Sequence, residues 1–368
     1  MKANKLPRLL AVPVALALAL GAAACGSDDE GSSDDTTATN GAIVAAFDAN
    51  GDGTVTIGVA TAGPRDDNGY SQTLVDFAEE FSAENSFDDP IIRDNIGAAE
   101  AAQAMSDLAE QGVDIMVVGA QEIAEPLTDL TEEFPDIFWY CNCGAGFEEL
   151  PGLAQATDQG ATIHYTAGVA MGAVLQEEGG TQAVFLGCCD LPFEREAYNA
   201  TVAGMQSVDP SFTMNYVGTG DAQYDFHNSA NATAALTNAI ANGATLAYAY
   251  LSDALDPVGQ LATDEGIAVF AAGPADICER DDGIAWTGSV VFDGGIYAAE
   301  ALRQIVNGEL TEGTTYSFPT EQGLNGVTVC DAEGDVQILV DESFVAVASD
   351  DDLLEVLGGI SAEAYGGG

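Results

Sequence analysis

The 368-residue chain is long enough for two domains, and 47% apolar residues are ample for sizeable cores. Its 8 Lys and Arg residues accompany 60 Asp and Glu residues, for a formal net charge of -52. Because phosphate neutralisation needs clustered cations, we expect no nucleic-acid partner. Such an acidic excess repels itself in dilute buffer, so composition favours a salt-rich habitat.

The melting temperature is accordingly expected to rise with NaCl, because the screening length shrinks to roughly 3 Å near 1 M salt. A melting series against NaCl checks this, and maximal stability in low-salt buffer would contradict it.

The first 24 residues predict a lipoprotein signal peptide. Lys2, Lys5 and Arg8 form a basic start, and residues 9–24 are apolar but short for a spanning helix and interrupted by Pro13. The following "AAAC" resembles a bacterial lipobox, which implies lipid on Cys25 and anchoring to the cell membrane from outside the cytoplasm. An ordinary signal peptide with an incidental cysteine is the alternative.

Residues 25–53 are rich in Ser, Thr, Gly and Asp, which predicts an acidic flexible tether. Near its end, Asp48, Asn50 and Asp52 alternate as in an EF-hand calcium loop. Position twelve of such a loop needs a Glu, whereas Val59 stands there, inside a run predicted as a strand. We therefore favour a solvated end of the tether over a calcium site, and expect no metal.

From residue 54 onward, short apolar runs alternate with amphipathic runs. In the first amphipathic run, residues 71–85, the side chains of Leu74, Phe77, Ala78 and Phe81 share one helical face. Further pairs follow up to residue 142, and a second series occupies residues 151–310, with apolar runs at 326–330 and 336–340. This pattern predicts an α/β protein of two lobes, each a parallel sheet flanked by helices, with a cleft between them.

In open parallel sheets the ligand binds beyond the carboxyl ends of the strands. That rule selects loops of both series. The ligand-binding candidates in them are Asp66, Asp67, Asn68, Tyr70, Gln121, Asp158, Phe193, Arg195, Asp221, Tyr224, Asp276 and Asp293.

Several motifs in this order resemble one family of receptors. The lipobox, "VTIGVAT" with "DDNGYSQ" behind it, "GVDIMVVG", "YTAGVAMGAVL", "AVFLG" and "YVGTGD" are similar to the basic membrane protein family. These are substrate-binding lipoproteins of ABC importers for nucleosides, with the type I periplasmic-binding fold. The resemblance implies an N-terminal lobe of residues 54–158 and 286–310, and a C-terminal lobe of residues 159–285 and 311–368. The chain would cross between lobes near Asp158, Trp286 and Leu310.

The same resemblance implies roles for the "DDNGYSQ" loop. Tyr70 takes the place of the aromatic that stacks on a purine, with Asp67 and Asn68 among the polar contacts; packing of Tyr70 on its own lobe is the alternative. A second family aromatic is replaced by Thr219 and Gly220, for which Tyr224 or Phe226 can substitute. The family's ribose-contacting Lys has no counterpart in residues 288–295.

Arginine is scarce after the signal peptide. Arg65 and Arg195 fall in predicted cleft loops and Arg280 just beyond another. Each can grip a carboxylate or phosphate of an anionic solute, or it can neutralise acidic neighbours.

Six cysteines remain after Cys25, and an even number outside the cytoplasm favours disulfides, with fifteen possible pairings. Their spacing is not that of a zinc site.

Three functions remain open. The first is capture of a small solute by two closing lobes and its delivery to the permease and ATPase of an ABC importer, by a protein compatible with a monomer. The second is a sensor that signals to a membrane partner; neighbouring permease and ATPase genes would favour import. An extracellular hydrolase is the third and the least favoured, because the sequence has no GxSxG, HExxH, P-loop or dinucleotide fingerprint and only two His. No cofactor is expected.

Overall fold

The computed structural model describes residues 43–119 and 121–366. The predicted signal peptide, the lipidation site Cys25 and most of the predicted tether lie outside this part. Among the described residues, no helix combines the length and the apolar character needed to cross a membrane. Residues 43–366 belong to one compact unit that contains two sheets.

The first sheet has six strands in the order β11-β5-β4-β3-β1-β2, and every neighbouring pair is parallel. Its strands are β1 (Ile57–Thr61), β2 (Ile91–Arg93), β3 (Ile115–Gly119), β4 (Phe138–Cys141), β5 (Ala154–Thr157) and β11 (Thr315–Ser317). Every residue of β1 and β3 is buried, which explains their unbroken apolar sequences: a parallel sheet has helices on both faces.

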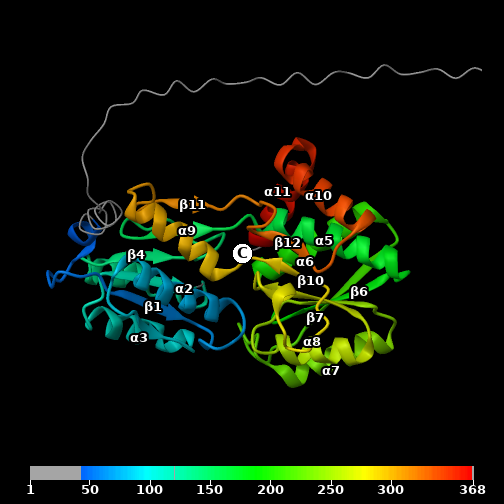
Figure 1. Cartoon of the computed structure of the whole chain (residues 1–368), viewed down its shortest axis with the longest axis horizontal. Coiled ribbons are helices and arrows are strands. Elements are labelled where there is room, and N and C mark those ends of the chain that lie inside the picture. The colour runs from blue at the N-terminus through cyan, green and yellow to red at the C-terminus, as the bar shows by residue number, and fades with distance from the viewer. Residues whose placement is uncertain (1–42, 120, 367–368) are drawn as a thin grey trace, which may run out of the picture. The chain divides into compact units, whose positions relative to one another are not determined.

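Alternate strand residues enter two different cores. Val59 packs in the core beneath α2 (Tyr70–Asn85) and α9 (Gly294–Val306), whereas Ala60 packs in the core beneath α3 (Ala101–Ala109) and α4 (Leu127–Glu133). The predicted face of α2 is confirmed: Leu74, Ala78 and Phe81 are buried in the first of these cores and Phe77 is partly buried against it. Figure 1 shows this lobe, with β1 between α2 and α3.

The second sheet also has six strands, in the order β12-β10-β9-β8-β6-β7. They are β6 (Gln182–Gly187), β7 (Thr213–Gly218), β8 (Leu246–Ala249), β9 (Ala268–Gly273), β10 (Gly288–Val291) and β12 (Gly326–Val329). All pairs are parallel except that of β10 with β12, an antiparallel edge strand. The predicted α/β class with two sheets flanked by helices is thus confirmed.

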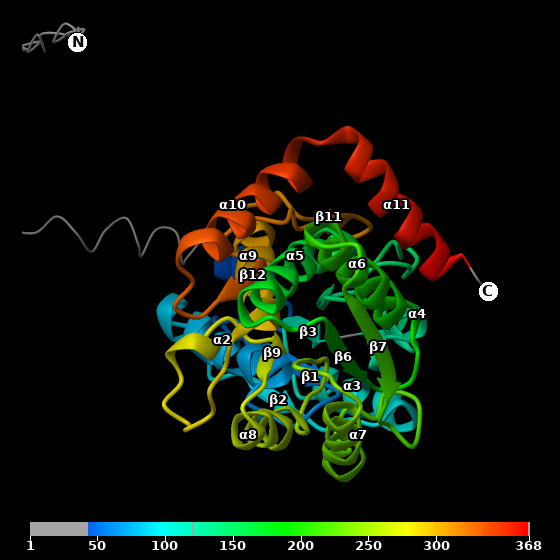
Figure 2. The ribbon, with the colours of Figure 1, turned by 90° about the vertical axis from the view of Figure 1, so that its right-hand side faces the viewer.

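Five helices cover this second sheet. α5 (Gly160–Glu178), α6 (Pro192–Val208) and α10 (Gly334–Ser349) bury one face, and α7 (Ser229–Ala241) and α8 (Leu255–Glu265) bury the other. α11 (Asp351–Tyr365) packs on α5 and α6, as Figure 2 shows near the C-terminus. Short helical turns cover residues Ala98–Glu100, Gln121–Ile123 and Ile277–Glu279.

The chain passes between the sheets three times: after β5, between β10 and α9, and between β11 and β12. The last two passages come later than the predicted crossings near Trp286 and Leu310. Trp286 lies before β10, a strand of the second sheet, and β11, which follows Leu310, still pairs with β5 of the first. β11 is short and polar and had no periodic signal. The apolar run 336–340 lies inside helix α10.

Residues 43–53 differ from the predicted flexible tether. Residues 43–47 are helical, and Ile43 is buried in the first lobe. The acidic loop is closed by its own residues, because Asp48 Oδ1 accepts from Gly51 N at 2.7 Å and Asp48 Oδ2 from Gly53 N at 2.9 Å. Asp114 accepts from Ala49 N at 2.9 Å and ties the loop to β3. The loop is therefore a structural cap on the first lobe.

The six cysteines lie in three close pairs: Cys141 with Cys143, Cys188 with Cys189, and Cys278 with Cys330. The third pair joins the segment after β9 to the end of β12. In the described part of the chain, no group of three or more potential ligands could hold a metal ion.

Candidate ligand-binding cleft

A cavity of about 430 Å³ lies between the two lobes. Loops that follow β1, β3, β4 and β5 line it from the first lobe, and loops that follow β6, β7, β8 and β10 line it from the second. All these strands end at the cavity, as expected for parallel sheets. Its volume is in the range of small-molecule sites.

Half of the predicted site residues line this cavity: Asp67, Tyr70, Gln121, Asp158, Phe193 and Tyr224. The other six are not in the lining: Asp66, Asn68, Arg195, Asp221, Asp276 and Asp293. Most of these six have partners that explain their position. Asp293 begins α9 by accepting from Gly295 N and Ile296 N, and Asp221 Oδ1 accepts at 3.1 Å from Asn231 Nδ2 in the first turn of α7.

Tyr70 is held in place from both sides. It is the first residue of α2, and its hydroxyl accepts a hydrogen bond from Asn142 Nδ2, at the end of β4, at 2.5 Å. Burial raises the pKa of this hydroxyl well above its usual value, so it stays protonated. The ring is therefore a fixed surface on the first-lobe side of the cavity.

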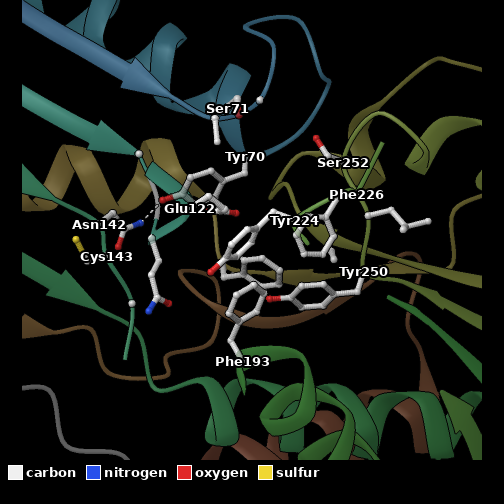
Figure 3. Close-up of a pocket in the computed structure, with 18 of the residues that line it drawn as sticks. Tyr70, Ser71, Glu122, Asn142, Cys143, Phe193, Tyr224, Phe226, Tyr250 and Ser252 are labelled. Atoms are coloured by element: carbon white, nitrogen blue, oxygen red, sulfur yellow. Dashed lines mark hydrogen bonds between the residues drawn. The ribbon is translucent and has the colours of Figure 1, made fainter. Parts of the chain in front are cut away.

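Aromatic side chains form the opposite side. We call Phe193, Phe226, Tyr250 and Phe292 the aromatic wall. The Tyr250 ring lies 5.4 Å from Phe292, stacked on it, and 6.2 Å from both Phe193 and Phe226. Figure 3 shows Phe193, Tyr224, Phe226 and Tyr250 gathered on one side, with Tyr70, Glu122 and Asn142 on the other.

The loop after β7 supplies two of the rings. Tyr224 has a left-handed backbone with a φ of 64°, which is uncommon for a residue other than Gly. Asp225 Oδ2 accepts from Asp221 N at 2.9 Å and holds the loop in this shape. Both Tyr224 and Phe226 thereby reach the cavity, although Thr219 and Gly220 directly after the strand are not aromatic.

The first-lobe loop that carries Asp67 and Asn68 touches the second lobe directly. Ser252 Oγ donates to Asp67 Oδ2 at 3.0 Å, and Asn68 Nδ2 donates to Asp256 Oδ2 at 3.0 Å. Arg280 Nη2 donates to the backbone oxygen of Asn68 at 2.7 Å. We call these five residues the latch, because their contacts hold the lobes together beside the cavity.

Arg280→Gln is expected to loosen the latch. A hydrogen bond from a charged donor contributes about 1.5–3 kcal/mol, so closure should weaken by roughly tenfold or more. Small-angle scattering should show a larger radius of gyration for the unliganded variant. Arg303→Gln is the matched control, because in the described part of the chain the Arg303 side chain pairs with Glu300 alone, on the exposed side of α9. Equal radii for Arg280→Gln and wild type would contradict the latch.

Acidic groups beside the cavity have raised pKa values. Burial, with Glu196 nearby, raises the pKa of Asp158 to about 7. Burial also raises the pKa of Glu196, whose carboxylate is bonded by Ser361 Oγ and by Tyr365 OH at 3.3 Å. Tyr365, the last residue of α11, itself lines the cavity. The C-terminal helix is thus part of the site.

His164 is a buried structural group in this arrangement. Its Nδ1 lies 2.7 Å from Gly160 O and its Nε2 lies 3.0 Å from Tyr248 OH. Burial lowers its pKa to about 4, so the ring is neutral near pH 7, with Nδ1 as the donor that the carbonyl requires.

No protein-family model matches the chain, and no curated protein matches it. Solved structures do. An ABC transporter solute-binding protein from Aeropyrum pernix is 14% identical with a TM-score of 0.63, over 85% of this chain and 92% of that one. One from Conexibacter woesei is 20% identical with a TM-score of 0.60, over 80% and 96%. A transcriptional activator from Bacillus halodurans is 14% identical with a TM-score of 0.62, over 80% and 98%.

The chain has the type I periplasmic-binding-protein fold. Matches at this level of identity establish the fold alone. The basic membrane protein family, to which the sequence motifs are similar, remains a prediction.

Within this periplasmic-binding fold, the arginines predicted as grips for an anion do not line the cavity. Arg65 Nη2 bonds Asp94 at 2.6 Å, and Arg195 Nη1 donates to Asp190 O at 2.6 Å beside the same residue's carboxylate. Arg280 pairs with Asp276 at 2.8 Å and, within the latch, donates to the backbone oxygen of Asn68. Each arginine serves acidic or backbone neighbours, which was the alternative that the sequence left open.

Several lining residues were not among the sequence candidates. Glu122, Glu196, Tyr250 and Phe292 lie in segments that follow strands and that the carboxyl-end rule selects, so the composition of those segments could have pointed to them. Asn142 directly follows β4, and the same rule covers it. Tyr297, His164 and Tyr365 had no such signal, because they project from helices α9, α5 and α11.

Proposed function

We propose that the protein is an extracytoplasmic receptor that captures a small solute between its two lobes and delivers it to an ABC importer. The observation that supports this most is the cavity itself, which both lobes line with Tyr70 on one side and the aromatic wall on the other. A solute that touches both sides stabilises the closed arrangement, and this differential contact is what closure requires.

The importer partnership is supported by the neighbours with this fold that are solute-binding proteins of ABC transporters. We further propose lipid attachment at Cys25, disulfides in the three cysteine pairs, and a monomer that meets a membrane permease and its ATPase. The motifs similar to nucleoside receptors make a nucleoside the ring-bearing solute to test first, with Tyr70 as its stacking surface.

A thermal-shift screen in high salt tests the receptor role. Its panel holds purine and pyrimidine nucleosides, sugars, amino acids, amines and small carboxylates. At least one class should raise the melting temperature, and Tyr70→Ala should reduce that rise. The receptor proposal fails if no class of the panel shifts the melting temperature. Equal binding by Tyr70→Ala and wild type would dismiss the stacking role of Tyr70 alone.

A further inference from the structure

Four carboxylic acids line the cavity. They are Asp67, Glu122, Asp158 and Glu196; no Lys or Arg of the described residues lines the cavity. Of the two histidines in the lining, His164 has partners at both ring nitrogens, whereas Nδ1 of His227 lies 3.3 Å from Asp253 without a hydrogen bond. An anionic solute would therefore meet several carboxyl groups and no Lys or Arg of the described residues.

Two of these carboxylates lack hydrogen-bond donors among the residues that the structure describes. Asp67 accepts from Gly69 N at 2.9 Å and from Ser252 Oγ at 3.0 Å, and Glu196 is bonded by α11. For Glu122 and Asp158, by contrast, no other described residue donates to the side chain, and burial raises the pKa of each. Both side chains are half-buried in the wall of the cavity, and a partly desolvated carboxylate without donors gains when a solute brings donors to it.

Glu122 and Asp158 share the cavity with tyrosines of both lobes. Glu122 and Asp158 both lie close enough to Tyr70 to raise the pKa of its hydroxyl. Glu122 has the same effect on Tyr224, and Asp158 on Tyr250 of the aromatic wall. Each of the two carboxylates shares the lining of one cavity with aromatic side chains of both lobes.

Some donors of the lining are already used: the Asn142 amide is bonded to the Tyr70 hydroxyl, and Ser252 donates to Asp67. Others, such as the amides of Gln121 and Gln223, can serve acceptors of a solute. An ionised carboxylate only accepts, so the part of the solute that meets Glu122 and Asp158 must bring donors, and preferably positive charge. A protonated amine offers up to three donors and no acceptor, and aromatic faces attract it as well.

Given the receptor role proposed above, we propose that the solute is an organic amine, bound as its ammonium ion. The charged group lies at Glu122 and Asp158, and the apolar part of the molecule rests on the aromatic wall. A neutral sugar or nucleoside can satisfy acceptors but leaves the carboxylates without a countercharge.

The affinity for such a cation should depend on pH through Asp158. This carboxyl is largely neutral below pH 7 and ionised above it, so a cation binds more weakly as the pH falls. Titratable groups from several elements surround Asp158. They are Glu196 of α6, Tyr365 of α11, Tyr248 of β8, Tyr250 directly after β8, Tyr297 of α9, Tyr70 of α2 and His164 of α5. Those tyrosines have pKa values raised above their usual 10 and the pKa of His164 is lowered to about 4, so none of these groups changes charge near pH 7. Burial raises the pKa of Glu196 and of Glu122 in the same direction as that of Asp158, so their response to pH has the same sign.

Three probes of one shape test the charge preference on the full-length protein in high salt: phenethylamine, phenethyl alcohol and phenylacetate. Calorimetry should give phenethylamine at least tenfold tighter binding than the alcohol and no measurable binding of phenylacetate. Between pH 8 and pH 5.5 the affinity for phenethylamine should fall several-fold, with proton release on binding near pH 6.5.

Asp158→Asn should weaken phenethylamine binding at least tenfold and flatten its pH dependence. Asp89→Asn, which removes one exposed charge outside the cavity, should change neither and controls for the net charge. The inference is wrong, and the receptor proposal stands, if phenylacetate, a sugar or a neutral nucleoside binds while phenethylamine, putrescine and choline do not. Unchanged amine affinity in Asp158→Asn would also overturn it. If no solute of any charge binds, the receptor proposal itself fails.

Discussion

Gly168→Val should lower the melting temperature more than any surface substitution in the chain, with a loss of roughly 3 kcal/mol or more of unfolding free energy. Gly168 lies where α5 meets α6, and a Cβ there would be 2.1 Å from Thr201 O and 2.9 Å from Gly204 Cα. Both are backbone atoms, which cannot move aside as a side chain can. The two helices would have to separate, and the core beneath them would open.

Gly358→Ala is the matched control for this substitution. Gly358 lies within α11 and a Cβ there meets nothing within 4 Å, so alanine should be neutral or stabilise the helix by about 1 kcal/mol. Thermal and urea unfolding of both variants measure the difference. If Gly168→Val melts at the wild-type temperature, the close contact between α5 and α6 is not a constraint in solution.

Tyr250→Ala should have the largest effect on binding of any single cavity substitution. Tyr250 is the residue of the aromatic wall that contacts the other three rings, and its ring also lies 5.9 Å from His164. Its removal deletes the centre of the wall, and central aromatic anchors typically contribute 2 kcal/mol or more. We therefore expect affinity for the best solute of the panel to fall by roughly thirtyfold or more.

Tyr250→Phe separates the ring from its hydroxyl. It keeps the stacking surface, so its affinity should stay within a few-fold of wild type. Melting temperatures without solute show whether either variant is destabilised. Equal affinity of Tyr250→Ala and wild type would place the solute elsewhere in the cleft.

Much of the site could be predicted because the strand–helix alternation is a local signal. An apolar run of five or six residues marks a strand, and the loop at its carboxyl end must face the same edge as its neighbours. This reasoning selected the loops of Tyr70, Phe193 and Tyr224, which the fold brings into one cavity. The same reasoning selected Arg195 and Asp293 from equivalent loops, and neither lines it.

Whether a predicted loop residue lines the cavity depends on the direction of its side chain. Asp293 and Phe292 are adjacent, yet Phe292 joins the aromatic wall while Asp293 turns to the start of α9. Asp67 was selected as a solute contact, and most of its bonds go to the start of α2 and across to Ser252. Only the neighbours in space decide which way a loop residue points.

The sequence by itself determined the class of fold and the loops that follow the strands, since periodicity is a property of residues near one another in the chain. Composition alone determined its acidic, arginine-poor character. The tertiary structure decided the rest. It placed β11 beside β5 and Tyr365 of α11 at the cavity, through contacts between segments far apart in the chain. It also placed Glu122 and Asp158 in one cavity lining with aromatic rings, with no donor to either carboxylate from another described residue. Such an arrangement depends on which groups meet in space, and no short stretch of sequence records that.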